Sequence, residues 1–342
     1  MPAAYAALGE YDEEHRAIIR EDLMVFAEEL IRLRTLPVRY VINGAEMPVQ
    51  QVEMRFFIPE YADFVDGAVE ASVSTSNVSD SGDVRGGQEF FPFPKRLFES
   101  WPLLSNAPDI PRASSAMMVP AIIQAAAYVT DGVPAYAERR AALLDFYYNN
   151  DDKWGNVDTW RGGAAQYESD DDDCSQHYFG RHLAWVAAHT WGLFETDPSQ
   201  LQLYRDEVLE GALWPATSHH KNAYFSFAYS AIQPAASPAA IDDAVHQTQD
   251  FRKPPRVRHS VDSTSKYGNK ACGGEHVSHD SAADSGDRPV VFYQWHSDPW
   301  LLVDDGDNRQ TYPGHDYLIA YWMGRALGHI PEDTAGQCLV WD

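Results

Sequence analysis

One pattern recurs along this chain: apolar residues at spacings of three and four, bounded by a capping residue, a proline or a glycine. In residues 11–36, which Pro37 terminates, the apolar positions are Ile19, Leu23, Phe26, Leu30 and Leu33. This spacing stacks side chains on one face of an α-helix, and such a face is stable only when another element covers it. The recurrence therefore predicts a mainly α-helical protein whose helices pack on one another.

The predicted helices begin near residues 11, 114, 134, 175, 198, 222, 238 and 316. At Asp197-Pro198 and Ser237-Pro238 a capping residue precedes a proline, which suits the first turn of a helix. Short turns join several of these helices, and helices joined in this way tend to pack antiparallel. We therefore expect helical hairpins in a ring or a stack, within a single domain that spans residues 1–342.

Two helices carry a specific expectation about burial. In residues 175–195 the apolar stripe consists of Phe179, Leu183, Val186, Thr190 and Leu193. The last helix, from Asp316 to Leu327, is apolar nearly all round. A helix of that kind is usually buried, so we expect it in the core.

Three regions depart from the helical pattern. Val, Ile, Phe and Tyr with Gly and Pro between them indicate short strands or an irregular excursion near residues 38–60. Ser, Asp and Gly dominate residues 72–95, so residues 38–112 as a whole are predicted to be an irregular, loop-rich insertion. Residues 252–290 are polar and predict a long loop.

The net charge is −25, because 51 acidic residues outnumber 26 basic ones, of which only six are lysine. Nucleic-acid binding needs a basic face that neutralises phosphates, and attraction to an anionic membrane needs the same, so this balance disfavours both. No apolar run reaches the length of a membrane span, and we expect no membrane insertion. The acidic, lysine-poor balance indicates a solubilising coat of the kind suited to a salty medium.

The cysteines are Cys174, Cys272 and Cys338, and no two of them form a CxxC pair. An odd and sparse set argues against a disulfide scaffold, with a bridge between Cys174 and Cys272 as the remaining option. Residues 1–10 lack the basic and apolar regions of a signal peptide. The expected cofactor content is none.

The segment 168–182 contains four adjacent aspartates, Asp170–Asp173. The simple interpretation is a solvated loop or helix start, where the helix dipole favours negative charge. The functional interpretation uses the four-residue spacing of Asp173, His177 and Arg181, which would place them on one helical face. There a carboxylate orients a base, an imidazole transfers a proton and a guanidinium neutralises a substrate anion. A structural calcium ion on the carboxylates is a third interpretation.

A second polar cluster covers residues 217–229. His220 and Tyr224 lie four residues apart, and Asn222 between them is either a helix N-cap or a substrate ligand. The adjacent His219 and His220 are compatible with a metal ion, but no further ligand follows at a suitable spacing. A weaker metal interpretation uses a loop that contains Cys272, Glu275, His276, His279 and Asp280.

Two aromatic segments lie near the end of the sequence. Trp295 and Trp300 flank polar residues that include Asp298, either as core packing or as a platform for the face of a sugar ring. Asp316 is expected to cap the last helix. No phosphate-binding loop, dinucleotide fingerprint or serine-hydrolase elbow occurs in a fitting context, so nucleotide binding and serine-hydrolase chemistry lack sequence support.

Several of these segments resemble large, uncharacterised secreted bacterial proteins that are built from helical hairpins of the α/α-toroid, six-hairpin glycosidase-like type. The resembling segments are Asp170–Asp173, Glu195–Pro198, His220–Tyr224, Trp295–Trp300 and Tyr312–Tyr317 with Tyr321–Arg325. The resemblance implies an α/α toroid-like array of hairpins and a secreted or cell-surface location. Residues 1–110 lie outside it.

Toroids of this type commonly host polysaccharide lyases and glycoside hydrolases in a central groove, so the resemblance implies a carbohydrate-active enzyme that takes an acidic polysaccharide or oligosaccharide. A hydrolase needs paired carboxylates, and the candidates are Asp172 and Asp173 with Asp298 or Asp316. A lyase needs a proton-transfer group and a ligand for the uronate, and the candidates are His177, Arg181, His220, Asn222 and Tyr224. In the leading hypothesis His177 or Tyr224 transfers the proton. Trp295 and Trp300 would stack on the sugar.

Two other interpretations stay open. A non-catalytic surface protein would use the helices as a scaffold and its grooves for a glycan or a partner. A class II terpene cyclase has a similar helical fold and uses an Asp-x-Asp-Asp acid, which Asp170–Asp173 satisfy, although the chain lacks convincing Gln-x-x-x-Gly-x-Trp repeats. Whether the chain is an enzyme is therefore open, with lyase or hydrolase activity favoured.

Overall fold

The computed structural model describes residues 12–42, 45–46, 48–55, 64–65, 68–73, 113–152, 154–167, 178–251, 257–258, 260–272, 275–278, 281–288, 299–311 and 315–331. The chain is mainly helical, as the apolar spacing predicted. Its residues group into two compact units, Met1–Tyr167 with Thr190–Val208 and Glu168–His189 with Leu209–Asp342. The single-domain organisation stays a prediction.

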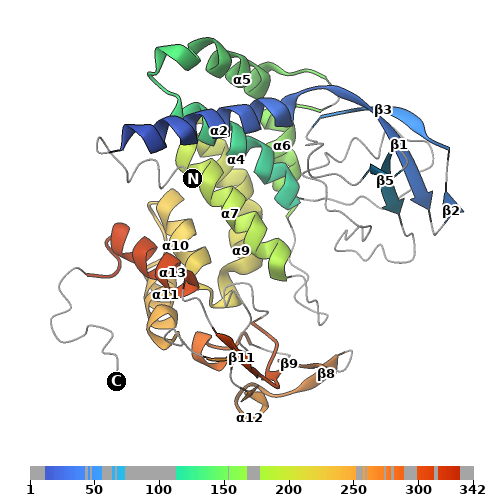
Figure 1. Ribbon diagram of the computed structural model, residues 1–342. Coiled ribbons are helices and arrows are strands. Elements are labelled where there is room, and N and C mark those ends of the chain that lie inside the picture. Colours follow the sequence, from blue (N-terminus) through green and yellow to red (C-terminus); the bar gives the residue numbers. More distant parts are fainter. Residues whose placement is uncertain are drawn as a thin grey trace. The chain divides into compact units, whose positions relative to one another are not determined.

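The helices of the first unit are α2 (Glu13–Ile31), α4 (Ala113–Val129), α5 (Ala137–Asn149), α6 (Val157–Ala164) and α8 (Pro198–Leu203), with the 3-10 turn η2 (Pro134–Tyr136) leading into α5. α2 lies beside α4 and α5, and α4 also packs against α6 (Figure 1). Gly132 follows α4 with φ +69°, a backbone angle that suits glycine at the end of a helix. The predicted starts at residues 134 and 198 are confirmed.

Ion pairs connect α2 and α5 across a long stretch of sequence. Arg139 donates two hydrogen bonds of 2.7 Å to the carboxylate of Glu28. It also donates to both carboxylate oxygens of Glu21, at 3.0 and 3.1 Å. The partners are 111 and 118 residues apart in the sequence. The ion pairs that hold α2 therefore form only after α5, which lies much later in the sequence, has been synthesised.

A five-stranded sheet follows α2. Its strands are β1 (Arg34–Ile42), β2 (Ala45–Glu46), β3 (Gln50–Met54), β4 (Phe64–Val65) and β5 (Ala68–Val73). β1 pairs antiparallel with β2 and β3 and parallel with β5, which pairs antiparallel with β4. The strands expected near residues 38–60 are confirmed. The helix predicted to continue to residue 36 instead ends at Ile31, because the β-branched Thr35, Val38 and Val41 favour a strand.

A buried carboxylate organises the first unit. Glu195, which is 5% exposed, accepts hydrogen bonds from the Tyr147 hydroxyl at 2.5 Å and from Nε2 of Gln124 at 3.1 Å. The backbone N–H of Asp197 donates to its other oxygen at 2.9 Å. The indole N–H of Trp191 donates to the Tyr147 hydroxyl at 2.9 Å. Neutral donors thus satisfy this acid and fix the turn that precedes α8.

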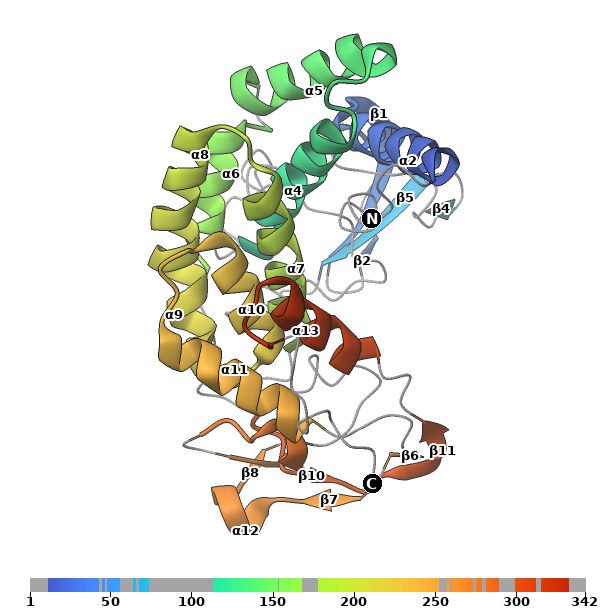
Figure 2. The same cartoon turned by 90° about the vertical axis from the view of Figure 1, so that its left-hand side faces the viewer.

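The second unit contains most of the other described helices. They are α7 (Tyr178–Phe194) up to His189, the π-helical segment η3 (Tyr204–Leu213) from Leu209, α9 (Trp214–Thr217), η4 (Ser218–His220), α10 (Ala223–Ile232), α11 (Pro238–Asp250) and α13 (His315–Ala326). α10, α11 and α13 pack pairwise side by side (Figure 2). Gly324 of α13 lies so close to Phe227 of α10 that an added Cβ would meet its ring at 2.9 Å. The starts predicted near residues 222 and 238 are confirmed.

The region predicted as one long loop, residues 252–290, instead contains short elements. They are β6 (Val257–Arg258), β7 (Val261–Asp262), α12 (Thr264–Tyr267), β8 (Lys270–Cys272), β9 (Glu275–Val277) and the 3-10 turn η5 (Ser285–Asp287), followed by β10 (Val303–Asp304) and β11 (Asp307–Thr311). β8 pairs with β9, but β6 pairs with β11 and β7 with β10. These strands are two to five residues long, and β6 and β7 find their partners far along the chain, so the local sequence does not mark those two.

Two expectations about helix faces are wrong. On α7 the stripe residues Val186 and Leu193 are exposed, whereas Trp185 and Trp191 are buried. An indole buries more apolar area than a valine or leucine side chain, so the tryptophans decide which face turns inward.

On α13 only one face is buried. Tyr317 and Ala320 are covered, but Leu318 and Ile319 are exposed and Trp322 is 61% exposed. The expectation that the last helix lies wholly in the core is therefore wrong, because the described neighbours α10 and α11 cover one side of it. Among the helices of the described ranges, none combines the length and apolar character that a transmembrane span requires.

Candidate functional site

The predicted site residues fall into two groups. Asp172, Asp173, His177, Trp295 and Asp298 lie outside the described residues, as does the side chain of Asp316, which follows His315 at the start of α13. Arg181, His220, Asn222, Tyr224 and Trp300 are described, and all five belong to the second unit. Their geometry decides which of the predicted segments meet.

Trp300 brings three predicted motif segments together. The guanidinium carbon of Arg181, near the start of α7, lies 5.6 Å from the centre of the Trp300 ring system. His220, at the end of η4, meets the same ring edge-on with 4.8 Å between ring centres, and His219 lies 6.0 Å away. A cation over an aromatic face is attracted by the negative charge of that face. These four residues are called the Trp300 junction below.

The Trp300 junction combines buried and accessible groups. Arg181 and His220 are 5% and 0% exposed, whereas His219 is exposed and Trp300 is half-buried. A ligand that approaches this site therefore reaches His219 and Trp300 first. The sequence predicts His219 only as half of a metal pair, and its adjacency to His220 is the one sequence signal for a place in the site.

Asn222 and Tyr224 serve the fold. Asn222 is the N-cap of α10, and its Oδ1 accepts a hydrogen bond from the backbone N–H of Phe225 at 3.3 Å. Tyr224 is buried beside His182, with 5.1 Å between ring centres, and burial raises the pKa of its phenol. His220 and Tyr224 do not share a helical face, because the chain turns at Lys221 between them.

The turn after His220 has an unusual backbone. Lys221 has φ 50°, and it is the one non-glycine residue with a positive φ in the described chain. A left-handed conformation of this kind costs an L-residue about 1–2 kcal/mol. Arg288, which is fully buried, donates from Nη2 to the carbonyl oxygens of His220 at 2.6 Å and Lys221 at 2.8 Å. Its Nε donates to the carbonyl of Ala283 at 2.9 Å.

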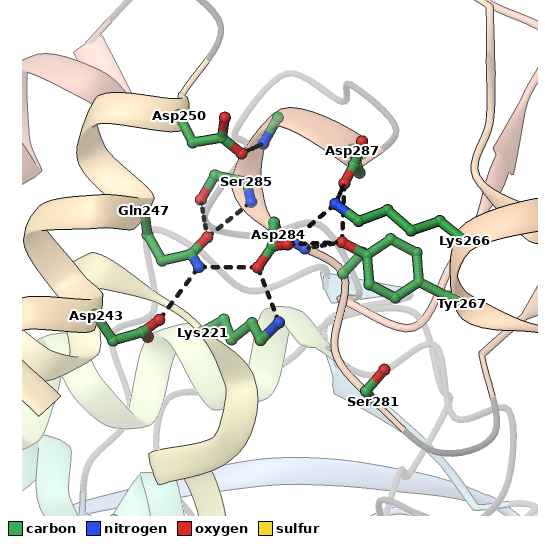
Figure 3. Close-up of polar contacts among 12 residues, drawn as sticks. Lys221, Asp243, Gln247, Asp250, Lys266, Tyr267, Ser281, Asp284, Ser285 and Asp287 are labelled. Carbon is green, nitrogen blue, oxygen red and sulfur yellow. Dashed lines mark hydrogen bonds and ion pairs between the residues drawn. The ribbon is translucent and has the colours of Figure 1, made fainter. Parts of the chain in front are cut away.

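Asp284 binds the side chain of the same lysine (Figure 3). Nζ of Lys221 donates to its Oδ1 at 2.8 Å, and Nε2 of Gln247 donates to the same oxygen at 3.1 Å. The hydroxyl of Tyr267 lies 2.9 Å from Oδ2, and Nζ of Lys266 lies 3.2 Å from it. Burial raises the pKa of Asp284, but the hydrogen bonds from Lys221, Gln247 and Tyr267 outweigh it and hold this pKa below its usual range.

The same network extends to Asp287 and Ser285. Nζ of Lys266 donates to Oδ2 of Asp287 at 2.5 Å. Burial raises the pKa of Tyr267 to about 12, so its phenol is neutral and donates near neutral pH. Oε1 of Gln247 accepts from the backbone N–H and the hydroxyl of Ser285, at 2.8 and 2.9 Å. The lysines and aspartates of this cluster pair with one another, and these hydrogen bonds join its own members. The cluster therefore links separate segments of the chain.

The metal interpretations gain no support in the described ranges. No group of three His, Cys, Asp or Glu side chains there is placed to hold a metal ion. Nδ1 of His276 lies 2.9 Å from Oδ1 of Asn269 instead. His279, Asp280 and Cys174 lie outside the described residues, so the bridge between Cys174 and Cys272 stays a prediction.

Comparison of the chain with protein-family models, with curated proteins and with solved structures finds no match. The class of protein is therefore defined by the fold and the site alone: a mainly helical, acidic protein with an arginine–histidine–tryptophan junction. The resemblance to secreted α/α-toroid proteins stays a prediction.

Proposed function

We propose that this chain binds an acidic polysaccharide or oligosaccharide at the Trp300 junction and cleaves it, as a polysaccharide lyase or a glycoside hydrolase. The observation that supports this is the meeting of Arg181, His220 and Trp300 from three separate motif segments around one ring. An indole suits the apolar face of a sugar, and a guanidinium suits the carboxylate of a uronate.

The residue types at the junction suit an anionic ligand. Around it the described residues include five basic or protonatable side chains: Arg181, His219, His220, Lys221 and Arg288. Lys221 binds Asp284, and Arg288 binds main-chain carbonyls. Guanidinium and imidazole groups are common ligands of a carboxylate, which supports a uronate as the ligand.

The burial of Tyr224 favours His177 as the proton-transfer group of a lyase, with the exposed His219 as a second imidazole. His177 precedes Arg181 by four residues, the spacing from which the sequence predicts that the two share one helical face. In a hydrolase the paired acids would be Asp172 and Asp173 with Asp298 or Asp316. The proposed framework is an α/α toroid-like array of helical hairpins, in a secreted or cell-surface protein.

A second candidate function is glycan or partner binding without turnover. One observation favours it: Arg181, His220, Asn222 and Tyr224 are all 7% exposed or less, and Asn222 is used as a helix cap. Four of the five lyase candidates are therefore buried. The terpene-cyclase hypothesis rests on Asp170–Asp173, which lie outside the described residues.

The test is a panel of uronate and neutral polysaccharides incubated with the protein. A lyase generates an unsaturated uronate, whose double bond is conjugated to the carboxylate and absorbs in the ultraviolet, and a hydrolase generates new reducing ends without that absorbance. Arg181→Ala should abolish binding and product formation. The matched control is Arg309→Ala, which removes an exposed arginine of the same unit. Binding without product supports the second candidate. Neither binding nor product overturns both the enzyme and the glycan-binding function.

A further inference from the structure

We propose that Arg288 and Asp284 are positioning residues, which hold the turn of residues 218–222 so that His219 and His220 face Trp300. The claim concerns the placement of two imidazoles and not contact with a ligand. It rests on the proposed function only in its last step, the effect on ligand affinity.

Arg288 is placed to act on the backbone. It is fully buried, and its described acceptors are three main-chain carbonyl oxygens, those of Ala283, His220 and Lys221. A guanidinium used in this way fixes the path of the chain because its donors lie in one rigid plane. Removing it would leave the carbonyls of His220 and Lys221 without these donors in a buried site.

The turn needs such a partner because of Lys221. A left-handed lysine is strained, and a strained residue persists only where its surroundings over-determine it. The segment 283–288 holds Lys221 through two contacts. Arg288 donates to the carbonyl oxygens of His220 and Lys221, and Asp284 binds the lysine ammonium at 2.8 Å. Gln247 and Tyr267 in turn fix the Asp284 carboxylate (Figure 3).

The effect reaches the Trp300 junction through a single peptide unit. His220 directly precedes Lys221, so relaxation of the left-handed residue rotates the chain that presents His220 to Trp300. Their present separation of 4.8 Å, edge-on, places the imidazole in the ring-current field of the indole. The imidazole proton resonances of His220 therefore report the placement directly.

The experiment compares Arg288→Gln, Lys221→Gly and the double variant in the full chain. Histidine ring resonances are assigned with His219→Gln and His220→Gln, and folding is checked by circular dichroism. We expect Arg288→Gln to move the His220 resonances toward those of an unstructured histidine. Lys221→Gly in the same chain should restore them, because glycine adopts this backbone angle without strain.

Two outcomes overturn the proposal. One is a folded Arg288→Gln protein with unchanged His220 resonances. The other is a displacement that Lys221→Gly does not reverse, which would assign Arg288 a packing role only.

If Arg288→Gln does not fold, Asp284→Asn provides the same test from the side-chain direction. It should displace the His220 resonances in the same sense but less far. The matched control is Asp242→Asn, an exposed acid on α11. Equal spectra for Asp284→Asn and this control would contradict the proposal.

A titration with tetragalacturonate separates this claim from the proposed function. We expect Arg288→Gln to weaken binding about tenfold or more, because misplaced binding groups lose affinity steeply. If the wild-type protein binds neither this ligand nor any other uronate, the proposed function fails, and the resonance measurements still decide the positioning claim.

Discussion

Glu195 in the first unit and Asp284 in the second are both withdrawn from water and hydrogen-bonded several times, but by different kinds of partner. The described donors to Glu195 are neutral: two tyrosines, a glutamine and a backbone N–H. Asp284 has two lysines among its donors, one of them largely exposed. Neutral donors in a site without water orient the Glu195 carboxylate and bring no opposite charge. The ion pairs of Asp284 with lysine lie at the edge of the solvent, and their strength depends on pH and salt concentration. The hydrogen bonds of Glu195 stabilise a core, whereas those of Asp284 link segments that are distant in the sequence.

The largest expected effect is at the neutral site. Glu195→Ala leaves the donors Tyr147, Gln124 and the backbone N–H of Asp197 without an acceptor in a buried place, and should lower the free energy of unfolding by about 3 kcal/mol. Asp284→Ala should lower it by about 1–2 kcal/mol, because water can reach Lys266. Urea denaturation measures both. An equal or larger loss for Asp284→Ala would break the comparison.

The hydroxyls of two tyrosines give a smaller effect in the same order. Tyr147→Phe removes the donor to Glu195 and the acceptor of the Trp191 indole N–H, and should lower the free energy of unfolding by about 1.5 kcal/mol. Tyr267→Phe, at a half-buried site, should lower it by about 1 kcal/mol or less. Thermal unfolding of the two variants ranks them, and the reverse order would contradict the picture.

Acid should weaken the charged site in a defined window. The pKa of Asp284 is lowered in the folded state, so its stabilisation is complete above the ordinary value of 3.8 and is lost as the pH falls from there through the lowered folded pKa. The difference in unfolding free energy between the wild type and Asp284→Asn should thus be constant from pH 7 to 5 and shrink toward pH 2. Denaturant midpoints at each pH measure it. A difference that grows on acidification would refute the assigned sign.

Salt should produce the smallest effect and the sharpest contrast. The side chain of Lys266 is 56% exposed, so added sodium chloride screens its attraction to Asp284 and Asp287. The stability advantage of the wild type over Lys266→Met should fall by a few tenths of a kcal/mol between low and high salt. The advantage over Glu195→Gln should stay constant. Parallel salt dependence of the two differences would show that both carboxylates behave alike.

Local features of the sequence predicted local structure well. Asn222 caps α10, and Pro198 and Pro238 begin their helices, because capping and proline geometry act over three or four residues. The short strands β6 and β7 escaped prediction because their partners lie tens of residues away.

The site shows the same limit. Clusters of His, Arg and Trp in the sequence predicted three site segments. In the structure Trp300, from one of these segments, contacts Arg181 and His220 from the other two. Nothing in the sequence marked Arg288, whose bond to the carbonyl of His220 spans 68 residues. The sequence did not predict the left-handed conformation of Lys221 either, because lysine has no preference for that conformation.

The distance in sequence between α2 and its partner α5 has a consequence during synthesis on the ribosome. Glu21 emerges 118 residues before Arg139. At about 5–20 residues per second, that interval lasts roughly 6 to 24 s. The apolar stripe of α2 stays uncovered until α4 has emerged, and Glu21 and Glu28 lack their partner Arg139 for the whole interval. The first described helix to be translated therefore completes its ion pairs only after α5 has been made.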